Sequence, residues 1–170
     1  NEPFAVILAD DFFDCNGEGV ISQLINIYKK YRCSIVAIEE IPITEVEKYG
    51  IISGNLIDES DNIIRVTNMF EKPKSQDLID LMKDKAINKK SQKFMAIAGR
   101  YILTPDIFEI LKNIDPGKNG EIQITDALKT QAKSGKVIAF KYKGNRFDCG
   151  SIEGYLKATI SLAKQRNLLK

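Results

Sequence analysis

The chain alternates short apolar runs with polar turns, and its first apolar run is the most informative. Residues 4–8 are continuously apolar and lead almost directly into two adjacent carboxylates, Asp10 and Asp11. A run of this kind predicts a strand buried on both faces, as in a parallel sheet. Open α/β sheets bind ligands at the carboxyl ends of their strands. We therefore expect the two aspartates to lie at a ligand site.

Helical and extended patterns alternate along the rest of the chain. Apolar residues at helical spacing predict helices, and apolar runs between turn residues predict strands. Together they indicate one α/β domain with a mixed sheet, spanning residues 1–170, whose first helix joins two strands in a β-α-β unit. The expected helices are 19–31, a short turn from 42 to 49, 75–85, 105–114, 122 or 125 to 133, and 151–166. The further expected strands are 33–38, 50–57 and 62–70 (a hairpin), 94–103, 137–142 and 146–148, with 12–17 as a loop.

Composition narrows the function classes. The chain has 170 residues, a net charge of +2, 44% hydrophobic and 28% charged residues, which is ordinary for a soluble globular protein. Basic residues are scattered, so we expect no nucleic-acid binding. No apolar run is long enough to span a membrane, and no secretory signal is visible. Three widely spaced cysteines (Cys15, Cys33 and Cys149) without a C-x-x-C motif are expected to be reduced thiols in the cytoplasm.

The chain contains no histidine. Catalytic triads built on histidine, histidine-ligated zinc and the usual neutral-pH general base are therefore excluded. Chemistry must rely on carboxylates, lysines, backbone amides or a metal. Asp10 and Asp11 repel each other, and Mg²⁺ is the cation that we expect to compensate them, because it prefers carboxylate oxygens together with substrate phosphates. The alternative is that one of the two aspartates caps a helix.

Glu71-Lys72-Pro73 follows a predicted strand and is the second candidate site. A carboxylate at this position can accept hydrogen bonds from sugar hydroxyls, and the neighbouring ammonium can pair with a phosphate. The alternative is a plain exit from the strand, because proline ends ladder pairing.

Two further stretches precede helices. Asp148, within residues 146–150, either belongs to the cap of the last helix or is a second metal carboxylate that faces Asp10. Residues 117–126 contain Glu121 behind two glycines, and are either a functional loop or a helix start capped by Thr125 or Asp126.

Taken in order, these stretches resemble the bacterial UTP–glucose-1-phosphate uridylyltransferases, also called UDP-glucose pyrophosphorylases. Each motif is short, but the series runs through essentially the whole chain. The motifs are L-A-D-D at 8–11, K-Y-G-I at 48–51, E-K-P at 71–73, G-R-Y-I-L-T-P at 99–105, G-x-x-G-E-I-Q-I-T-D-A at 117–127 and R-F-D-C-G-x-x-x-G-Y at 146–155. The resemblance implies a Rossmann-like mixed, mainly parallel sheet flanked by helices, the nucleotide-diphospho-sugar transferase fold.

The resemblance also implies a role for each residue that matches a family motif. Asp10, with Asp11 beside it, and Asp148 would bind Mg²⁺. Glu71 would bind the glucose hydroxyls, and Lys72 would bind the sugar phosphate, which makes Lys72 and Asp10 the candidate catalytic residues.

The remaining positions that match the motifs are expected to bind the substrate or to shape the pocket. Gly50 would approach the hexose, and Asp11 and Glu121 are further candidate substrate-binding residues. We expect Asp126, Arg100 and Tyr101 to support the pocket.

The family reaction transfers UMP from UTP to glucose 1-phosphate, forming UDP-glucose and releasing pyrophosphate. This reaction suits a chain without histidine, because the sugar phosphate is already an anionic nucleophile at neutral pH. Positioning and charge neutralisation by Mg²⁺, lysine and backbone donors can carry the catalysis. The resemblance also implies a homo-oligomer.

The family's opening glycine-rich segment of the type L-A-A-G-x-G-T-R, which binds the nucleotide phosphates, has no counterpart in this chain. We therefore expect a fold incomplete at the N-terminus, with the sugar and metal residues of a longer active enzyme, inactive alone. Its exposed apolar edge at residues 4–8 should promote self-association, as should the terminal helix. The alternatives are a non-catalytic sugar-phosphate-binding or subunit-association module, a thymidylyltransferase that makes dTDP-glucose, and a metal-dependent glycosyltransferase.

Overall fold

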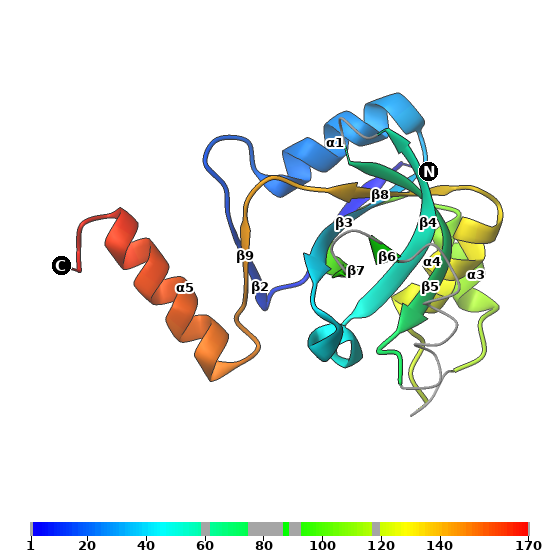
Figure 1. Ribbon diagram of the computed structural model, residues 1–170. Coiled ribbons are helices and arrows are strands. Elements are labelled where there is room, and N and C mark those ends of the chain that lie inside the picture. The colour runs from blue at the N-terminus through cyan, green and yellow to red at the C-terminus, as the bar shows by residue number, and fades with distance from the viewer. Residues whose placement is uncertain (1, 59–61, 75–86, 89–92, 117–119, 170) are drawn as a thin grey trace.

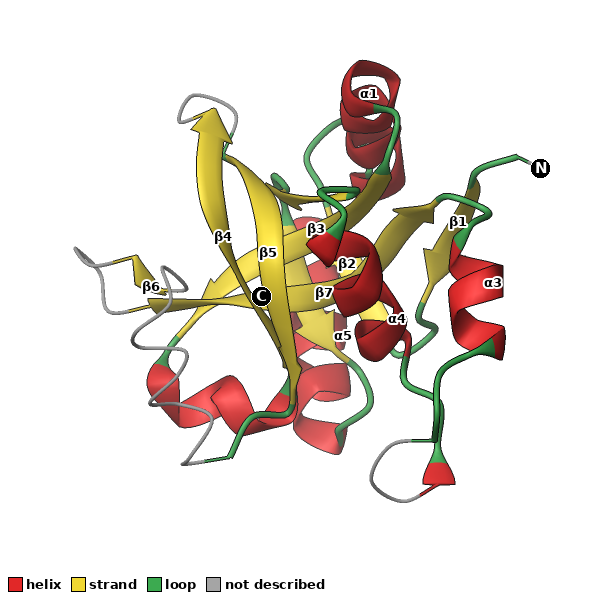
Figure 2. Ribbon diagram, turned by 90° about the vertical axis from the view of Figure 1, so that its right-hand side faces the viewer, coloured by secondary structure: helices red, strands yellow, loops and turns green. Residues whose placement is uncertain are grey.

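A twisted sheet with helices on both faces forms the body of the protein (Figures 1 and 2). The computed structural model describes all residues except 1, 59–61, 75–86, 89–92, 117–119 and 170. The expected helix at 75–85 lies outside the described residues. The strands are β1 (Phe4–Ile7), β2 (Asp11–Asp14), β3 (Ser34–Ile41), β4 (Gly50–Asp58), β5 (Ile63–Glu71), β6 (Ile87–Asn88), β7 (Lys93–Leu103), β8 (Val137–Lys141) and β9 (Asn145–Asp148). The helices are α1 (Val20–Tyr31), the 3₁₀ helix η1 (Ile43–Lys48), α3 (Ile107–Lys112), α4 (Ile124–Lys133) and α5 (Ile152–Gln165).

Within the described residues, seven strands form the main sheet and two form a separate small sheet. The main sheet has the order β1-β7-β3-β8-β5-β4, with β6 beside β7, and β4 also pairs with β7. In the small sheet, β2 pairs with β9. The mixed sheet with flanking helices is as expected, but the prediction that it is mainly parallel is wrong. Only β3 and β8 pair in parallel among the strands described. The reason is that β7 lies between β1 and β3 and runs antiparallel to both.

Among the described residues the core has three apolar clusters, and the two larger ones lie on opposite faces of the main sheet. On one face, Val20 and Leu24 of α1 pack against strand residues such as Ile35 and Ile138. On the other face, Ile107 of α3 and Leu128 of α4 pack against residues of β3, β5, β7 and β8. The continuous apolar sequences of β3 and β8 follow from this arrangement, because both of their faces are covered.

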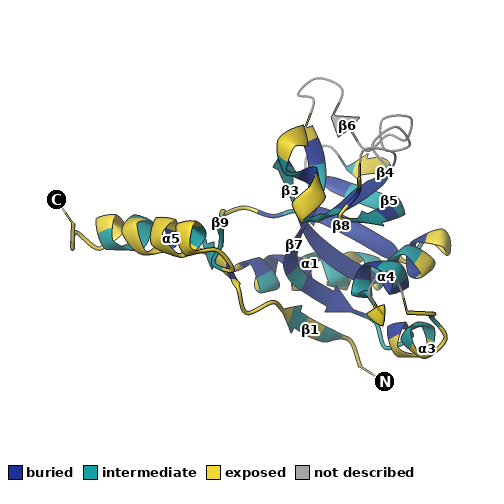
Figure 3. Cartoon of the chain, turned by 90° about the horizontal axis from the view of Figure 1, so that it is seen from below, coloured by how far each residue is buried: buried dark blue, intermediate teal, exposed yellow. Residues whose placement is uncertain are grey.

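The first strand differs from the prediction. β1 is not buried on both faces: its burial alternates, and Ile7 and Leu8 are 58% and 43% exposed. It lies at the end of the strand order and pairs with β7 alone among the strands described, so one edge and part of one face stay uncovered (Figure 3). The loop expected at 12–17 is wrong for residues 12–14, because Asp11–Asp14 is β2, and holds for residues 15–17. Its partner β9 lies more than 120 residues further along the chain, where local sequence patterns cannot reveal it.

The helix and hairpin predictions are otherwise close to the structure. β4 and β5 form the expected antiparallel hairpin. The hydroxyl of Ser151 caps α5 by accepting a hydrogen bond from the Gly154 N–H at 3.1 Å. Gly135 follows α4 with φ of 70°, the left-handed conformation that ends many helices. The helix expected at 105–114 is shorter, as α3 covers Ile107–Lys112.

Helix α5 projects from the body, contacting β9 and, through a hydrogen bond from Gln165 to Asp14, β2 (Figures 1 and 3). Its apolar side chains at helical spacing are exposed: Ile152, Tyr155, Leu156 and Ile160. In the part of the chain that the structure describes, no helix is both long and apolar enough to cross a membrane.

The backbone of β7 lies in direct contact with the segment that joins β1 to β2. The Leu8 N–H donates to the Gly99 carbonyl at 3.0 Å, and the Gly99 N–H donates to Asp11 Oδ2 at 2.9 Å. A Cβ atom on Gly99 would overlap Asp11 Oδ2 and lie 2.7 Å from the Cβ of Leu8. This close approach requires glycine, because any side chain would push the two segments apart.

Substitution Gly99→Ala should therefore destabilise the fold by about 1–3 kcal/mol, the usual cost of overpacking a tight site. Urea denaturation would measure the change in free energy of unfolding. Gly19→Ala is the matched control, because a Cβ on Gly19 would have no heavy atom within 4 Å. Equal stability of the two variants would contradict the proposed steric requirement.

Candidate active site

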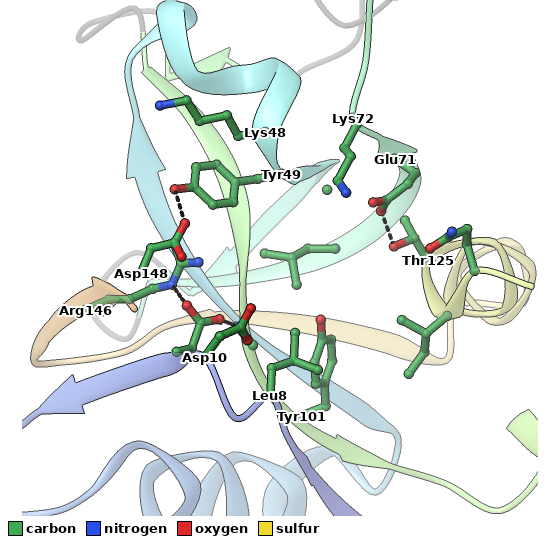
Figure 4. A pocket seen from close by; sticks show the side chains of 16 residues that line it. Leu8, Asp10, Lys48, Tyr49, Glu71, Lys72, Tyr101, Thr125, Arg146 and Asp148 are labelled. Carbon is green, nitrogen blue, oxygen red and sulfur yellow. Dashed lines mark hydrogen bonds and ion pairs between the residues drawn. The ribbon is translucent and has the colours of Figure 1, made fainter. Parts of the chain in front are cut away.

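A cavity of about 360 Å³ opens where η1, β2, α4 and the ends of β4, β5 and β9 converge (Figure 4). Asp10 and Asp148 lie on one side of it, here called the acidic side, and Glu71 and Lys72 lie together on the opposite side. The cavity is lined by Leu8, Asp10, Asp11, Lys48, Tyr49, Gly50, Glu71, Lys72, Ile97, Gly99, Tyr101, Gln123, Ile124, Thr125, Arg146 and Asp148.

Asp10 and Asp148 face each other across a gap that Gly150 leaves open. The antiparallel register of β2 and β9 pairs Asp11 with Asp148, and the Cys149 N–H donates to the Asp10 carbonyl at 2.7 Å. A Cβ on Gly150 would lie 3.1 Å from Asp148 Oδ1 and 3.2 Å from Asp10 Oδ2. Both carboxylates therefore point into one small space.

This donor set fits a hard divalent cation. Mg²⁺ is usually held by one or two carboxylates, while waters and substrate phosphates complete its coordination. Within the described residues, no group of three or more His, Cys, Asp or Glu side chains could enclose a metal. Asp10 and Asp148 thus suit a cation shared with a phosphate rather than one in an all-protein cage.

Asp11 is held by protein groups. Arg146 Nε donates to Asp11 Oδ1 at 2.6 Å and its NH1 donates to Glu39 Oε1 at 2.6 Å, and the side chains of Asp11 and Arg146 are only 5% and 7% exposed. Burial lowers the pKa of the Arg146 guanidinium, but the hydrogen bonds and charges of Asp11 and Glu39 outweigh it and raise the pKa. Because Asp11 Oδ2 also accepts from Gly99, we assign Asp11 to the pocket wall. Its direct binding of substrate stays a prediction.

Glu71 and Lys72 are placed by the β4–β5 hairpin. Gly50 pairs with Glu71 in the hairpin register, and the Thr125 hydroxyl donates to Glu71 Oε2 at 2.6 Å. A Cβ on Gly50 would lie 3.3 Å from Glu71 Oε2, so glycine leaves room beside the carboxylate. Lys72 has φ of 43°, a left-handed conformation that costs a non-glycine residue on the order of 1 kcal/mol. This turn aims the side chain into the cavity beside Glu71 (Figure 4).

The cavity brings together most of the residues that the sequence suggested. Asp10, Asp11, Gly50, Glu71, Lys72 and Asp148 all line it, and so does Tyr101. Glu121 is exposed outside the lining and accepts a hydrogen bond from Gln123, which does line the cavity. The functions of all these residues stay predictions.

Sequence reasoning missed several residues that line the cavity. These are Lys48, Tyr49, Gln123, Thr125 and Arg146. Each is a direct neighbour of a selected residue or belongs to the same motif (K-Y-G-I, Q-I-T-D-A and R-F-D-C-G), so the motifs themselves were the available signal.

Comparison with known proteins identifies the family. The model of the nucleotidyl transferase family matches residues 1–165. The chain belongs to this family. A UTP–glucose-1-phosphate uridylyltransferase from Pseudomonas aeruginosa is 52% identical over 160 residues, which cover 94% of this chain and 52% of that protein. The chain spans about half the length of the curated relatives that it matches.

Solved structures agree with this assignment. An apo UDP-glucose pyrophosphorylase superimposes with a TM-score of 0.84 at 49% identity, covering 98% of this chain and 56% of that one. A UDP-glucose pyrophosphorylase complexed with UDP-glucose gives a TM-score of 0.82 at 48% identity, covering 97% and 57%. The resemblance and the fold class inferred from the sequence motifs are thus confirmed, apart from the strand directions noted above.

Substitution Asp11→Asn should destabilise this nucleotidyl transferase chain by about 3 kcal/mol, because it removes one partner of a buried ion pair. Chemical denaturation followed by circular dichroism would measure the loss. Glu109→Gln is the matched control, since it breaks the pair between Glu109 and Lys112, which is exposed. An exposed pair contributes about 1 kcal/mol or less. If both variants lost the same stability, our assignment of Asp11 to the pocket wall as a buried ion-pair partner would be refuted.

Proposed function

We propose that this chain carries the sugar-phosphate-binding and metal-binding part of an enzyme that converts UTP and glucose 1-phosphate to UDP-glucose and pyrophosphate. The observation that carries the proposal is the convergence of the Asp10–Asp148 carboxylate pair and the Glu71–Lys72 pair on one cavity. Nucleotidyl transferase membership and the solved relative described as complexed with UDP-glucose support the choice of substrates.

The proposed reaction is a displacement at phosphorus. A phosphate oxygen of glucose 1-phosphate forms a bond to the α-phosphorus of UTP, and the bond from this phosphorus to the oxygen that bridges to the β-phosphorus breaks. Pyrophosphate leaves with that oxygen. The nucleophile is already ionised at neutral pH, so the absence of histidine is no obstacle. Positioning and charge stabilisation can supply most of the rate enhancement.

Four side chains have assigned tasks in this proposal. Lys72, as a point charge, would hold and aim the attacking phosphate. Glu71, held by the Thr125 hydroxyl, would accept hydrogen bonds from sugar hydroxyls. Asp10 and Asp148 would hold Mg²⁺, which neutralises phosphate charge when bound.

We also propose a cytoplasmic location. The three cysteines, Cys15, Cys33 and Cys149, are free thiols, which supports a reducing compartment.

Release of pyrophosphate from UTP, glucose 1-phosphate and Mg²⁺ tests the proposal. The whole enzyme of which we propose this chain to be a part, here called the full-length protein, should release pyrophosphate. Its double variant Asp10→Asn plus Asp148→Asn should release pyrophosphate at least a hundredfold more slowly, because the metal loses both carboxylates. The 170-residue chain alone should stay at the level of this variant. Release by the chain alone above that level would refute our assignment of only the sugar and metal part to it.

A full-length protein without activity would instead favour the non-catalytic sugar-phosphate-binding module. Binding of glucose 1-phosphate, measured by calorimetry, would then remain and should be weakened by Lys72→Met. Activity with dTTP that exceeds activity with UTP would favour the thymidylyltransferase.

Self-association is a further part of the proposal. The uncovered edge of β1 and the exposed apolar face of α5 are the two surfaces that support it, with Ile7 and Leu8 on the first and Ile152 and Leu156 on the second.

Sedimentation velocity of the 170-residue chain should show species larger than the monomer. Substitution of both Ile152 and Leu156 by Glu should shift the distribution toward the monomer, because charge opposes burial of this face. Lys157→Glu, on the same helix but in an exposed ion pair with Glu153, is the control for added negative charge. A monodisperse wild-type monomer would contradict the expectation.

A further inference from the structure

Tyr49 makes hydrogen bonds to residues on both sides of the pocket that it lines. It lies between η1 and β4, in extended conformation. Its carbonyl oxygen accepts a hydrogen bond from the Lys72 N–H at 3.3 Å. Its hydroxyl donates to Asp148 Oδ2 at 3.2 Å, as Figure 4 shows. A single residue therefore connects the proposed phosphate-binding lysine to the proposed metal-binding carboxylate.

The ring of Tyr49 is itself held in place. The guanidinium carbon of Arg146 lies 4.7 Å from the centroid of the ring, a cation–π contact. Two donors of Arg146 are engaged by Asp11 and Glu39 at 2.6 Å each, which restricts the guanidinium. The ring that carries the hydroxyl is thus packed against a guanidinium that two ion pairs hold in place.

Asp148 is consequently held at both carboxylate oxygens. Tyr49 donates to Oδ2, and the Gly150 N–H donates to Oδ1 at 3.1 Å. Two donors on opposite oxygens fix the rotation of the Asp148 carboxylate. They thereby fix how this carboxylate is oriented toward the space that it shares with Asp10 beside Gly150. Partners of this kind orient metal ligands and commonly change metal affinity when they are removed.

We propose that Tyr49 is a positioning residue that orients Asp148 for divalent-cation binding and sets its place relative to Lys72. The proposal rests on the proposed function, in which Asp10 and Asp148 hold the metal. Tyr49 acts through Asp148: its hydroxyl is already directed to that carboxylate, and its ring covers Arg146.

Mn²⁺ binding to the full-length protein, followed by the electron paramagnetic resonance signal of free Mn²⁺, tests this positioning. Tyr49→Phe keeps the ring over Arg146 and removes only the hydroxyl, so the fold should be retained. We expect the dissociation constant for Mn²⁺ to rise about tenfold. The dissociation constant for glucose 1-phosphate, measured by calorimetry, should stay within about twofold of the wild-type value, because the contact of Lys72 with Tyr49 is made by the backbone.

Tyr28→Phe is the matched control. Tyr28 lies on α1, outside the pocket lining, and its ring also packs against an arginine, Arg32, at 5.6 Å. This control should bind Mn²⁺ like the wild type. Asp148→Asn gives the reference for loss of the ligand itself and should weaken Mn²⁺ binding more than Tyr49→Phe.

Three results would overturn the proposal: Mn²⁺ affinity of Tyr49→Phe equal to the wild type, equal weakening of Mn²⁺ and glucose 1-phosphate binding, or no saturable Mn²⁺ binding by the wild type. The proposed function fails on a different observation, the absence of pyrophosphate release by the wild type. In an active protein, the Mg²⁺ concentration for half-maximal rate should also rise about tenfold in Tyr49→Phe, with the KM for glucose 1-phosphate unchanged.

Discussion

The buried ion pair of Arg146 and Asp11 is the centre of a polar network that joins the small β2–β9 sheet to the main sheet. Arg146 comes from β9 and Asp11 from β2, and Arg146 also reaches Glu39 of β3. Asp11 in turn accepts a hydrogen bond from Gly99 of β7. Charges this deeply buried are tolerated only when they are paired and hydrogen-bonded, which these contacts achieve. The junction also places Asp10 and Asp148 on the acidic side of the cavity, because Asp10 precedes Asp11 in the chain and Asp148 is paired with Asp11 in the β2–β9 register.

The other side of the cavity depends on backbone geometry rather than on charge. The β4–β5 hairpin register places Gly50 opposite Glu71, and the left-handed conformation of Lys72 turns its side chain inward. Thr125, at the start of α4, then holds the Glu71 carboxylate. The two sides meet at Tyr49, whose ring covers Arg146 and whose carbonyl accepts from Lys72. Tyr49 therefore connects the Arg146–Asp11 ion pair to Lys72, the residue that follows the β4–β5 hairpin.

Under the proposed function, this construction would let a chain without histidine serve phosphate chemistry. The carboxylates that remain accessible, Asp10 and Asp148, share one gap, while the carboxylate that is neutralised, Asp11, serves the structure. Adjacent aspartates thus have different tasks because their surroundings differ. Electrostatic positioning of an anionic nucleophile and an anionic leaving group is the contribution that such an arrangement can make.

The amino-acid sequence by itself determined the helices α1 and α5, the β4–β5 hairpin and the membership of a family, because periodicity, caps and ordered motifs are local properties. It also indicated most of the residues that line the cavity. Only the tertiary structure decided that β7 separates β1 from β3, that 11–14 is a strand, and that Asp11 is paired with Arg146. These features join residues about 53 to 137 positions apart in the sequence. Such pairing depends on burial and charge in three dimensions, which no local pattern encodes.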